Sequence, residues 1–290
     1  EGSKQFAEKY SIPNCFDSYE KMYQSSLIDA VYIAVPNSLH MEISKYFLSR
    51  KIPTFCEKPL ASNIEQVKSM IDCAKEHHTY LQEGLIPLYN PNFKILKENL
   101  KKVGKIHQVN LNFSKYSSRY NAYLRGENPT TFRRELSNGA SMDLGVYIFA
   151  DCIGLFGKPK KIFSTAILLD TGVDISGSSI FVYDDFNVNL TYSKANDTEN
   201  KCEICGELGQ LIIDQPSQPQ SIIFVNRKTG EKKEIGITPQ ENFYYEIKEM
   251  IEQVDKCQIE SQKVPFKISL SVHDVLTESR KQAGIKFLCD

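Results

Sequence analysis

The chain has 290 residues, of which 41% are hydrophobic and 24% are charged, and its formal net charge is -1. This balance is typical of a folded protein with about two domains, and it excludes a wholly disordered or collagen-like chain. The charge also lacks the basic excess of a dedicated nucleic-acid binder, so we predict no nucleic-acid partner.

Neither the apolar runs nor the cysteines point to a membrane or to secretion. The longest clean apolar run, 30–36, covers about seven residues, whereas a membrane-spanning helix needs roughly 18. We therefore predict a soluble protein with no membrane partner. The eight cysteines are spread along the chain, which favours reduced thiols in the cytoplasm over disulfides. Cys202 and Cys205 form a single pair in a strand-like pattern, so we predict no metal site.

Short apolar strands alternate with helical patterns in the first part of the chain, 1–86. The run 30–35 is apolar throughout, which is typical of a parallel strand covered by helices on both faces. The alternation follows a β-α-β-α-β pattern, which indicates an α/β sheet. The expected strands are 30–35, 52–56 and 79–83, and the expected helices cover about 39–48 and 64–74.

The pattern changes after Pro87, and we predict a second domain over 87–290. Residues 107–115 alternate apolar and polar side chains, which indicates a strand with one polar face in an open sheet. The second domain is thus an α+β unit with a mostly antiparallel sheet. Its other expected elements are strands at 179–183, 186–192, 210–214 and 221–226, and helices at about 92–103, 140–156, 242–255 and 269–287.

Glu57, Lys58 and Pro59 follow the expected strand 52–56 at its carboxyl end. Ligands of open α/β sheets bind at the carboxyl ends of strands, so this Glu-Lys pair is placed to meet a substrate or cofactor. The Lys58–Pro59 bond is a candidate cis peptide, which would fix the direction of the lysine in a tight turn. A lysine at a strand end is otherwise most often solvated surface.

Three ordered motifs stand at 34–40 (AVPNSLH), 57–59 (EKP) and 137–147 (SNGASMDLGVY). In this order and spacing they resemble the Gfo/Idh/MocA family of NAD(P)-dependent oxidoreductases. The resemblance implies a Rossmann dinucleotide-binding domain over 1–86 and a C-terminal α/β domain over 87–290 that binds the substrate and whose open sheet often mediates oligomers. It also implies NAD or NADP as cofactor, a sugar, polyol or diol as small-molecule substrate, and a homodimer or higher homo-oligomer.

The resemblance assigns cofactor contacts to five positions. Lys58 is similar to the family's catalytic lysine, and Glu57 lies beside it near the nicotinamide ribose. Pro36, Asn37 and His40 match the loop that touches the cofactor. All five positions lie in the first two motifs.

The third motif places Asp143 and Tyr147 at the family's active-site pair, in the second domain. Four residues are about one helical turn, so both side chains are expected on one face. Tyr147 stands where the usual residue is histidine, which is more similar to the dihydrodiol-dehydrogenase, glucose-fructose oxidoreductase and xylose-dehydrogenase branch than to the inositol-dehydrogenase branch. Leu88 stands where many members carry an arginine, which weakens the expected recognition of an anionic or heavily hydroxylated substrate. Arg133, Arg134 and Tyr120 could compensate.

No Gly-X-Gly-X-X-Gly turn precedes residue 30, and the chain begins with Glu1. A Rossmann domain needs that turn for the pyrophosphate, and a residue about twenty positions later selects NAD or NADP. We therefore expect the first β-α-β unit to be missing from this chain and to lie upstream in the natural protein.

Hydride transfer requires that the proton of the substrate hydroxyl be handled at the same time. We expect Tyr147 to exchange this proton, Lys58 to orient the substrate oxygen and lower the tyrosine pKa, and Asp143 to hold the lysine or a sugar hydroxyl. A second assignment makes Lys58 the proton donor. The alternatives to an enzyme are a non-catalytic NAD(P)- or sugar-sensing protein of this fold, and a chain that cannot bind cofactor.

Overall fold

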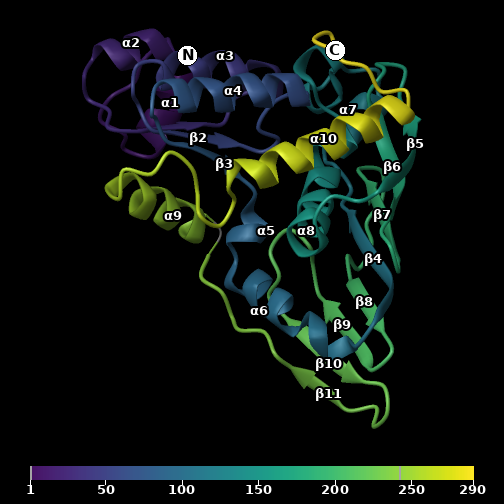
Figure 1. Cartoon of the computed structure of the whole chain (residues 1–290). Coiled ribbons are helices and arrows are strands. Elements are labelled where there is room, and N and C mark those ends of the chain that lie inside the picture. Colours follow the sequence, from purple (N-terminus) through teal and green to yellow (C-terminus); the bar gives the residue numbers. More distant parts are fainter. Residues whose placement is uncertain (1, 242) are drawn as a thin grey trace.

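The computed structural model describes residues 2–241 and 243–290, and its strands form two separate sheets (Figure 1). Sheet A contains three strands and sheet B contains eight. Helix α10 (Phe266–Gln282) packs against α4 (Ile64–Glu76) beside sheet A and against α8 (Val146–Phe156) beside sheet B. The predicted α/β region followed by an α+β region is confirmed.

Sheet A is parallel with the order β1-β2-β3, as the alternating pattern predicts. Ile33 pairs with Cys56 and Cys56 pairs with Glu83, so the three carboxyl ends lie at one edge. Asn63 caps α4 by accepting a hydrogen bond from the Gln66 amide at 3.0 Å. The elements of this region are α1 (Gly2–Lys9), α2 (Tyr19–Gln24), β1 (Val31–Ile33), α3 (His40–Leu48), β2 (Thr54–Glu57), α4 and β3 (Leu81–Gly84).

Strand β1 is an edge strand of sheet A within the described residues, and only one of its faces is buried. Val31 and Ile33 are buried, whereas Tyr32 between them is 47% exposed. The prediction of a strand covered on both faces is therefore wrong for β1, because Tyr32 donates a hydrogen bond to Glu57 instead of packing under a helix. A groove of about 630 Å³ runs between β1 and α1.

Sheet B has the order β11-β10-β9-β8-β4-β7-β6-β5, and all its neighbours are antiparallel except β4 and β7. In β4, Val109, Leu111 and Phe113 are buried, while Asn110 and Asn112 lie on the other face. The predicted alternation is thus confirmed. The strands are β4 (Ile106–Ser114), β5 (Lys161–Leu168), β6 (Asp174–Val182), β7 (Asn187–Ser193), β8 (Cys202–Gly206), β9 (Gly209–Ile213), β10 (Ile222–Asn226) and β11 (Lys232–Glu234).

The main core lies between sheet B and α8, where the Phe149 ring packs against Phe181 and Tyr192. One helical run in the described part of the chain, 134–156, could cross a membrane by length and composition alone. However, 78% of its most apolar window is buried inside the protein, which is the pattern of a core helix.

The helices predicted for the second region are present with shifted ends, whereas α5 (Ile86–Tyr89) and α7 (Tyr120–Leu124) were not predicted. The expected helix 242–255 begins on residue 242, which lies outside the described residues, as does Glu1. The expected helix 269–287 starts three residues earlier and ends earlier, as α10. Strand β5 was not predicted, because its exposed side chains include Phe163 and Ile167 and hide the alternation. The other helices are α6 (Pro91–Asn99) and α9 (Tyr244–Asp255).

Candidate active site

The candidate site lies where the carboxyl ends of β1, β2 and β3 meet the start of α8. Three segments leave this edge of sheet A, 34–40, 57–60 and 85–89, and the first two carry the predicted cofactor-contacting residues. Ligands of parallel sheets bind at this edge. The side chains at this edge come from both regions of the chain, the one that contains sheet A and the one that contains sheet B.

Lys58 leaves β2 and forms a cis peptide bond with Pro59, as the sequence suggested. Its Nζ donates hydrogen bonds to the Asp143 backbone oxygen at 2.7 Å and to Asp143 Oδ1 at 2.9 Å. The Lys58 side chain is only 12% exposed. Burial alone would lower the pKa of Lys58. The charge and hydrogen bond of Asp143, together with the effects of Tyr147 and Glu57, outweigh burial and raise this pKa above its usual range. Lys58 is therefore an ammonium at neutral pH.

Asp143 is bound by two lysines at once. Lys58 holds Oδ1, and the Nζ of Lys194 donates to Oδ2. Burial alone would raise the pKa of Asp143, but the charges of Lys58 and Lys194 hold it well below its usual range. Lys194 is 6% exposed and follows β7 directly. Sequence reasoning missed Lys194, whose only signal is a lysine at the end of a predicted strand.

The Tyr147 ring faces the Lys58 ammonium. The Lys58 Nζ lies over this ring, 4.5 Å from its centre, and Phe113 contacts the ring edge-on at 5.7 Å between centres. Burial raises the pKa of Tyr147, and the opposing effect of Lys58 does not compensate for it. Lys58 thus lowers the tyrosine pKa as expected, but burial has the larger effect, so the pKa stays above its usual value.

Asp143 and Tyr147 lie on one continuous helical run, but not on regular α-helix. Residues Ser141–Gly145 form a π-helical turn, η5, which leads into α8. Asp143 lies in that turn and Tyr147 in the first turn of α8, and both contact Lys58. Single π turns inside α-helices are frequent at functional sites.

Asp174 on β6 holds the start of this π turn. Its Oδ2 accepts a hydrogen bond from the Ser141 amide at 2.7 Å, and its Oδ1 accepts one from the Ser141 hydroxyl at 3.1 Å. Gly139 makes the close approach possible, because it has φ +132 and an added Cβ would lie 2.2 Å from Asp174 Oδ1. The Asp174 side chain is fully buried.

Comparison with known proteins decides the family. Residues 1–85 match the model of an oxidoreductase family with an NAD-binding Rossmann fold, GFO_IDH_MocA, and residues 98–212 match a GFO/IDH/MocA C-terminal domain. An uncharacterized oxidoreductase of Escherichia coli, YgjR, is 42% identical over 292 residues, covering 100% of this chain and 88% of that protein. The chain belongs to the GFO/IDH/MocA oxidoreductase family.

A further relative and a structure of the same fold are informative. The scyllo-inositol 2-dehydrogenase (NADP(+)) IolU of Bacillus subtilis is 35% identical over 291 residues, covering 100% of this chain and 88% of that enzyme. The crystal structure of KijD10, a 3-ketoreductase from Actinomadura kijaniata in complex with NADP and TDP-benzene, superimposes with a TM-score of 0.86 at 18% identity, covering 97% of this chain and 86% of that chain. The protein is accordingly an oxidoreductase of the GFO/IDH/MocA family.

Glu57, in the second motif of this GFO/IDH/MocA enzyme, is held on both carboxylate oxygens. Its Oε1 accepts a hydrogen bond from the Tyr32 hydroxyl, and its Oε2 accepts one from the Lys58 amide at 3.1 Å. Glu246 on α9 lies close enough for the Glu57 charge to act on it, and both Glu246 carboxylate oxygens are buried without a partner among the described residues. Burial, together with that charge, raises the pKa of Glu246, which the sequence did not single out.

Some residues of the first motif lie at the exposed edge of sheet A, and others lie in the interior. Pro36 is exposed, and the Asn37 side-chain amide donates to the Ser137 carbonyl at 2.9 Å and to Asn138 Oδ1 at 3.0 Å. Asn37 thus connects the first and third motifs. His40 is 1% exposed, so the structure places its ring in the interior behind the loop.

The expected arginine corner is apolar in this chain. Leu88 is 6% exposed and packs close to Gly154 of α8, where an added Cβ would lie 2.9 Å from Leu88 Cδ2. Arg133 and Arg134 donate to the carbonyl oxygens of Asn128 and Lys286, and neither contacts Lys58 or Asp143. Both arginines are thus engaged with backbone carbonyl oxygens, and that of Lys286 lies 152 positions from Arg134 in the chain.

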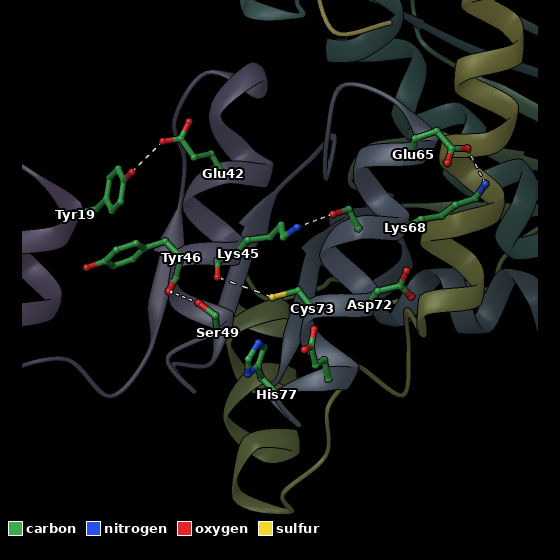
Figure 2. Close-up of a pocket in the computed structure, with 12 residues that line it drawn as sticks. Tyr19, Glu42, Lys45, Tyr46, Ser49, Glu65, Lys68, Asp72, Cys73 and His77 are labelled. Atoms are coloured by element: carbon green, nitrogen blue, oxygen red, sulfur yellow. Dashed lines mark hydrogen bonds and ion pairs between the residues drawn. The ribbon is translucent and has the colours of Figure 1, made fainter.

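A separate groove of about 800 Å³ lies between α3 and α4 (Figure 2). Lys45 donates a hydrogen bond to the Ser69 hydroxyl at 2.8 Å. Figure 2 shows Lys68 paired with Glu65, at 2.7 Å. None of the lining side chains belongs to the predicted site. Residues 2–241 and 243–290 also contain no group of three or more His, Cys, Asp or Glu side chains arranged to hold a metal.

Proposed function

We propose that this enzyme transfers a hydride between NAD(P) and a CH–OH or carbonyl carbon of a sugar, polyol or cyclic diol, with Lys58 and Tyr147 handling the proton. The observation that carries the proposal is the Lys58 ammonium, which contacts Asp143 and the Tyr147 ring at the carboxyl edge of sheet A. The names of the relatives, an inositol dehydrogenase and a ketoreductase, support this substrate class.

Residues at the sheet edge fit the nicotinamide end of the cofactor. Bound there, NAD(P) supplies the hydride chemistry. We assign Pro36 and Asn37 to contacts with the cofactor, and Glu57 to accepting a ribose hydroxyl. This donor set suits a neutral ribose, because the Glu57 carboxylate is already fixed by Tyr32 and the Lys58 amide. Lys58 completes the set as a cation next to the reacting carbon.

The protonation states favour carbonyl reduction at neutral pH. Lys58 is held as an ammonium by Asp143, and burial keeps Tyr147 as a neutral phenol. In reduction, Tyr147 donates its proton to the substrate oxygen while the Lys58 charge stabilises the developing alkoxide. The assignment of Lys58 as the donor uses the same contacts with the roles exchanged.

Asp143 and Lys194 orient this pair. Asp143 fixes the direction of the Lys58 side chain, and Lys194 keeps the Asp143 carboxylate ionised. The backbone oxygen of Asp143 adds a second acceptor for Lys58, at 2.7 Å. A sugar hydroxyl that displaced Lys58 or Lys194 from the Asp143 carboxylate would leave a buried charge unpaired, which is costly. We therefore assign Asp143 to lysine orientation.

Substitution of Lys58 tests the proposal. In the full-length enzyme, Lys58→Met is expected to lower kcat about 100-fold or more on a panel of inositols, aldoses and their keto forms, with NADH and NADPH each supplied. Lys105→Met, which removes an exposed lysine paired with Asp185, serves as the matched control. Fluorescence of the dihydronicotinamide reports cofactor binding separately. Turnover of Lys58→Met within about tenfold of wild type would contradict the proposed role.

We also propose that the enzyme is a homodimer that pairs through the open face of sheet B. Phe163 on β5 and Ile180 on β6 are paired neighbours, and they are 59% and 43% exposed, with Ile167 at 66% nearby. Such clustered apolar side chains are typical of an interface. Ile180→Glu is expected to yield monomers in analytical ultracentrifugation, and Leu288→Glu, at an exposed position elsewhere, is the control.

The cytoplasm is the proposed location. All eight cysteines are free thiols in the structure, which agrees with a reducing compartment. Fractionation of cells that express the tagged protein tests this location. Recovery with membranes or outside the cell would contradict it.

A further inference from the structure

One face of α10 holds the backbone that follows the active-site lysine. Thr277 Oγ1 accepts a hydrogen bond from the Ile64 amide at 3.0 Å, and Arg280 Nη2 donates to the Ser62 carbonyl at 2.9 Å. Thr277 is 6% exposed and Arg280 is 1% exposed. Two side chains of one helix therefore fix the segment only four to six residues beyond Lys58.

A third side chain of α10 acts through Glu83 of β3. His273 Nε2 lies 2.7 Å from Glu83 Oε1, and the same oxygen accepts a hydrogen bond from the Leu60 amide at 3.0 Å. Glu83 and His273 are 2% and 1% exposed. Burial alone would raise the pKa of Glu83, but the charge of His273 and the Leu60 amide bring it below its usual value. Glu83 is thus a carboxylate aimed at the backbone two residues after Lys58.

The opposite side of the same peptide unit is held by His40. The Leu60 amide belongs to the peptide bond whose oxygen is that of Pro59, and His40 Nδ1 lies 2.9 Å from this oxygen. His40 Nε2 lies 2.8 Å from the Val35 oxygen, so the ring joins the ends of β1 and β2. Burial lowers the pKa of His40, and the neutral ring has one N–H to donate. Both polar atoms of the Pro59–Leu60 peptide are therefore contacted by buried side chains.

We propose that the α10 face formed by His273, Thr277 and Arg280, together with Glu83, sets the direction of Lys58 towards Asp143. The three α10 positions are spaced by four and three residues, which puts them on one side of the helix. None of them touches the reacting atoms, so they are positioning residues. The inference rests on the proposed role of Lys58 in proton handling.

The free-energy cost of burying these polar side chains supports a role in orienting Lys58. Glu83 Oε2 is buried without a partner among the described residues, and an unpaired buried oxygen destabilises a fold. Apolar side chains at such places often give equal or greater stability than a buried ion pair. Hydrogen bonds to backbone amides, in contrast, fix orientation, and small displacements of a catalytic group cost about 100-fold in rate. Stability alone does not account for the set.

Paired substitutions of Glu83 test the proposal in the full-length enzyme. Glu83→Leu removes the nearer acceptor of the Leu60 amide and leaves only His273 Nε2, at 3.2 Å, whereas Glu83→Gln keeps an acceptor at the same place. Glu83→Leu is expected to speed hydrogen exchange of the Leu60 amide about tenfold, and to lower kcat about tenfold or more while the KM for NADPH changes less than about threefold. Glu83→Gln is expected to retain most of kcat.

A pH profile separates positioning from a general structural role. A Lys58 side chain that no longer points at Asp143 loses the charge that raises its pKa, so the alkaline limb of kcat/KM is expected to move to lower pH in Glu83→Leu. A role in stability alone would lower the unfolding temperature of the variant and leave this limb in place. Equal kcat values for Glu83→Leu and wild type, with faster exchange at Leu60, would overturn the proposal.

Thr277 supplies a second test if Glu83→Leu does not fold. Thr277→Val removes only the hydroxyl that accepts from Ile64, and Thr277→Ser restores it. We expect Thr277→Val to lower kcat by at least about threefold and Thr277→Ser to recover it. Lys58→Met is the reference variant. If Lys58→Met stays active, the proposed function is wrong. If Lys58→Met is inactive while Glu83→Leu and Thr277→Val are both fully active, only the positioning role is wrong.

Discussion

The Lys58 ammonium lies 4.5 Å from the centre of the Tyr147 ring, over its face, while the same nitrogen binds Asp143 at 2.9 Å. The lysine therefore touches both residues that the sequence suggested as its partners. Each contact favours the protonated lysine, through the carboxylate charge and through the ring's negative face. Acid chemistry follows from this arrangement more readily than base chemistry.

The two directions of the reaction should differ in their dependence on pH. The pKa values of Lys58 and Tyr147 are both raised, so both groups keep their protons at pH 7 and the acid needed for carbonyl reduction is fully present. Alcohol oxidation needs a deprotonated group, whose fraction grows about tenfold per pH unit below its pKa. Initial rates in both directions between pH 6 and 10 test this: reduction stays level up to pH 8, and oxidation rises throughout. An oxidation rate that levels off below pH 8 would count against it.

Removal of the Tyr147 hydroxyl tests its role as proton donor separately from the role of the aromatic ring. Tyr147→Phe keeps the aromatic face for Lys58 and the contact with Phe113, so folding and cofactor affinity are expected to persist. The rate of reduction is expected to fall by about 10² to 10⁴, the usual contribution of a general acid. Steady-state kinetics alongside NADPH titration measure both quantities. An unchanged kcat would show that Lys58, and not Tyr147, donates the proton.

Lys194 is expected to matter although the sequence did not indicate it. Lys194→Met leaves Asp143 with a single cation, so the Asp143 pKa rises and its grip on Lys58 weakens. A loss of about tenfold in kcat and a lower unfolding temperature are expected. Lys201→Met, which removes an exposed lysine paired with Glu199, should change neither measurement.

Asp174 should make stability fall as the pH rises. Burial raises its pKa from 3.8 to about 6 in the folded protein, despite the hydrogen bonds from Ser141 that lower it. The folded state thus holds the proton more tightly, and this stabilisation is full below pH 3.8 and is lost as the pH passes through about 6. Asp174→Asn removes the effect. The unfolding free energy of wild type relative to Asp174→Asn, from urea titrations, is expected to drop by about 2.4 kcal/mol between pH 4 and 7.5.

Gly139 should tolerate no side chain. In Gly139→Ala the new Cβ would meet Asp174 Oδ1 at 2.2 Å, on top of the backbone strain at φ +132. A loss of about 2 kcal/mol or more in unfolding free energy, with reduced kcat through the displaced π turn, is expected. Gly230→Ala has φ +72 with no atom within 4 Å, so it isolates the backbone strain at about 1 kcal/mol. Equal effects of the two substitutions would remove the argument for contact with Asp174.

Local patterns in the sequence were sufficient for much of the fold. The apolar runs predicted the three strands of sheet A, and the alternation in 107–115 predicted the polar outer face of β4. Both depend on side chains that are close in sequence. Motifs also brought Lys58, Asp143 and Tyr147 together, although the sequence gives no physical reason why residues 85 positions apart should meet.

The parts that were not predicted depend on distant pairing. Lys194 reaches Asp143 across 51 positions, and Glu83 meets His273 across 190, so no periodicity near either residue could reveal its partner. Glu83 did carry a signal, as a carboxylate at the carboxyl end of the predicted strand 79–83. The pKa of Tyr147 could not be predicted either, because the extent of its burial decides the sign of the shift.

The hydrogen bonds from α10 to the segment after Lys58 span 213 and 218 positions of the chain. During synthesis, β2 and Lys58 emerge long before Thr277 and Arg280 exist, and N-terminal regions begin to fold as they emerge. The segment after the lysine therefore remains without its final partners while most of sheet B is being made. These backbone contacts of the segment therefore form only after α10 has been synthesised.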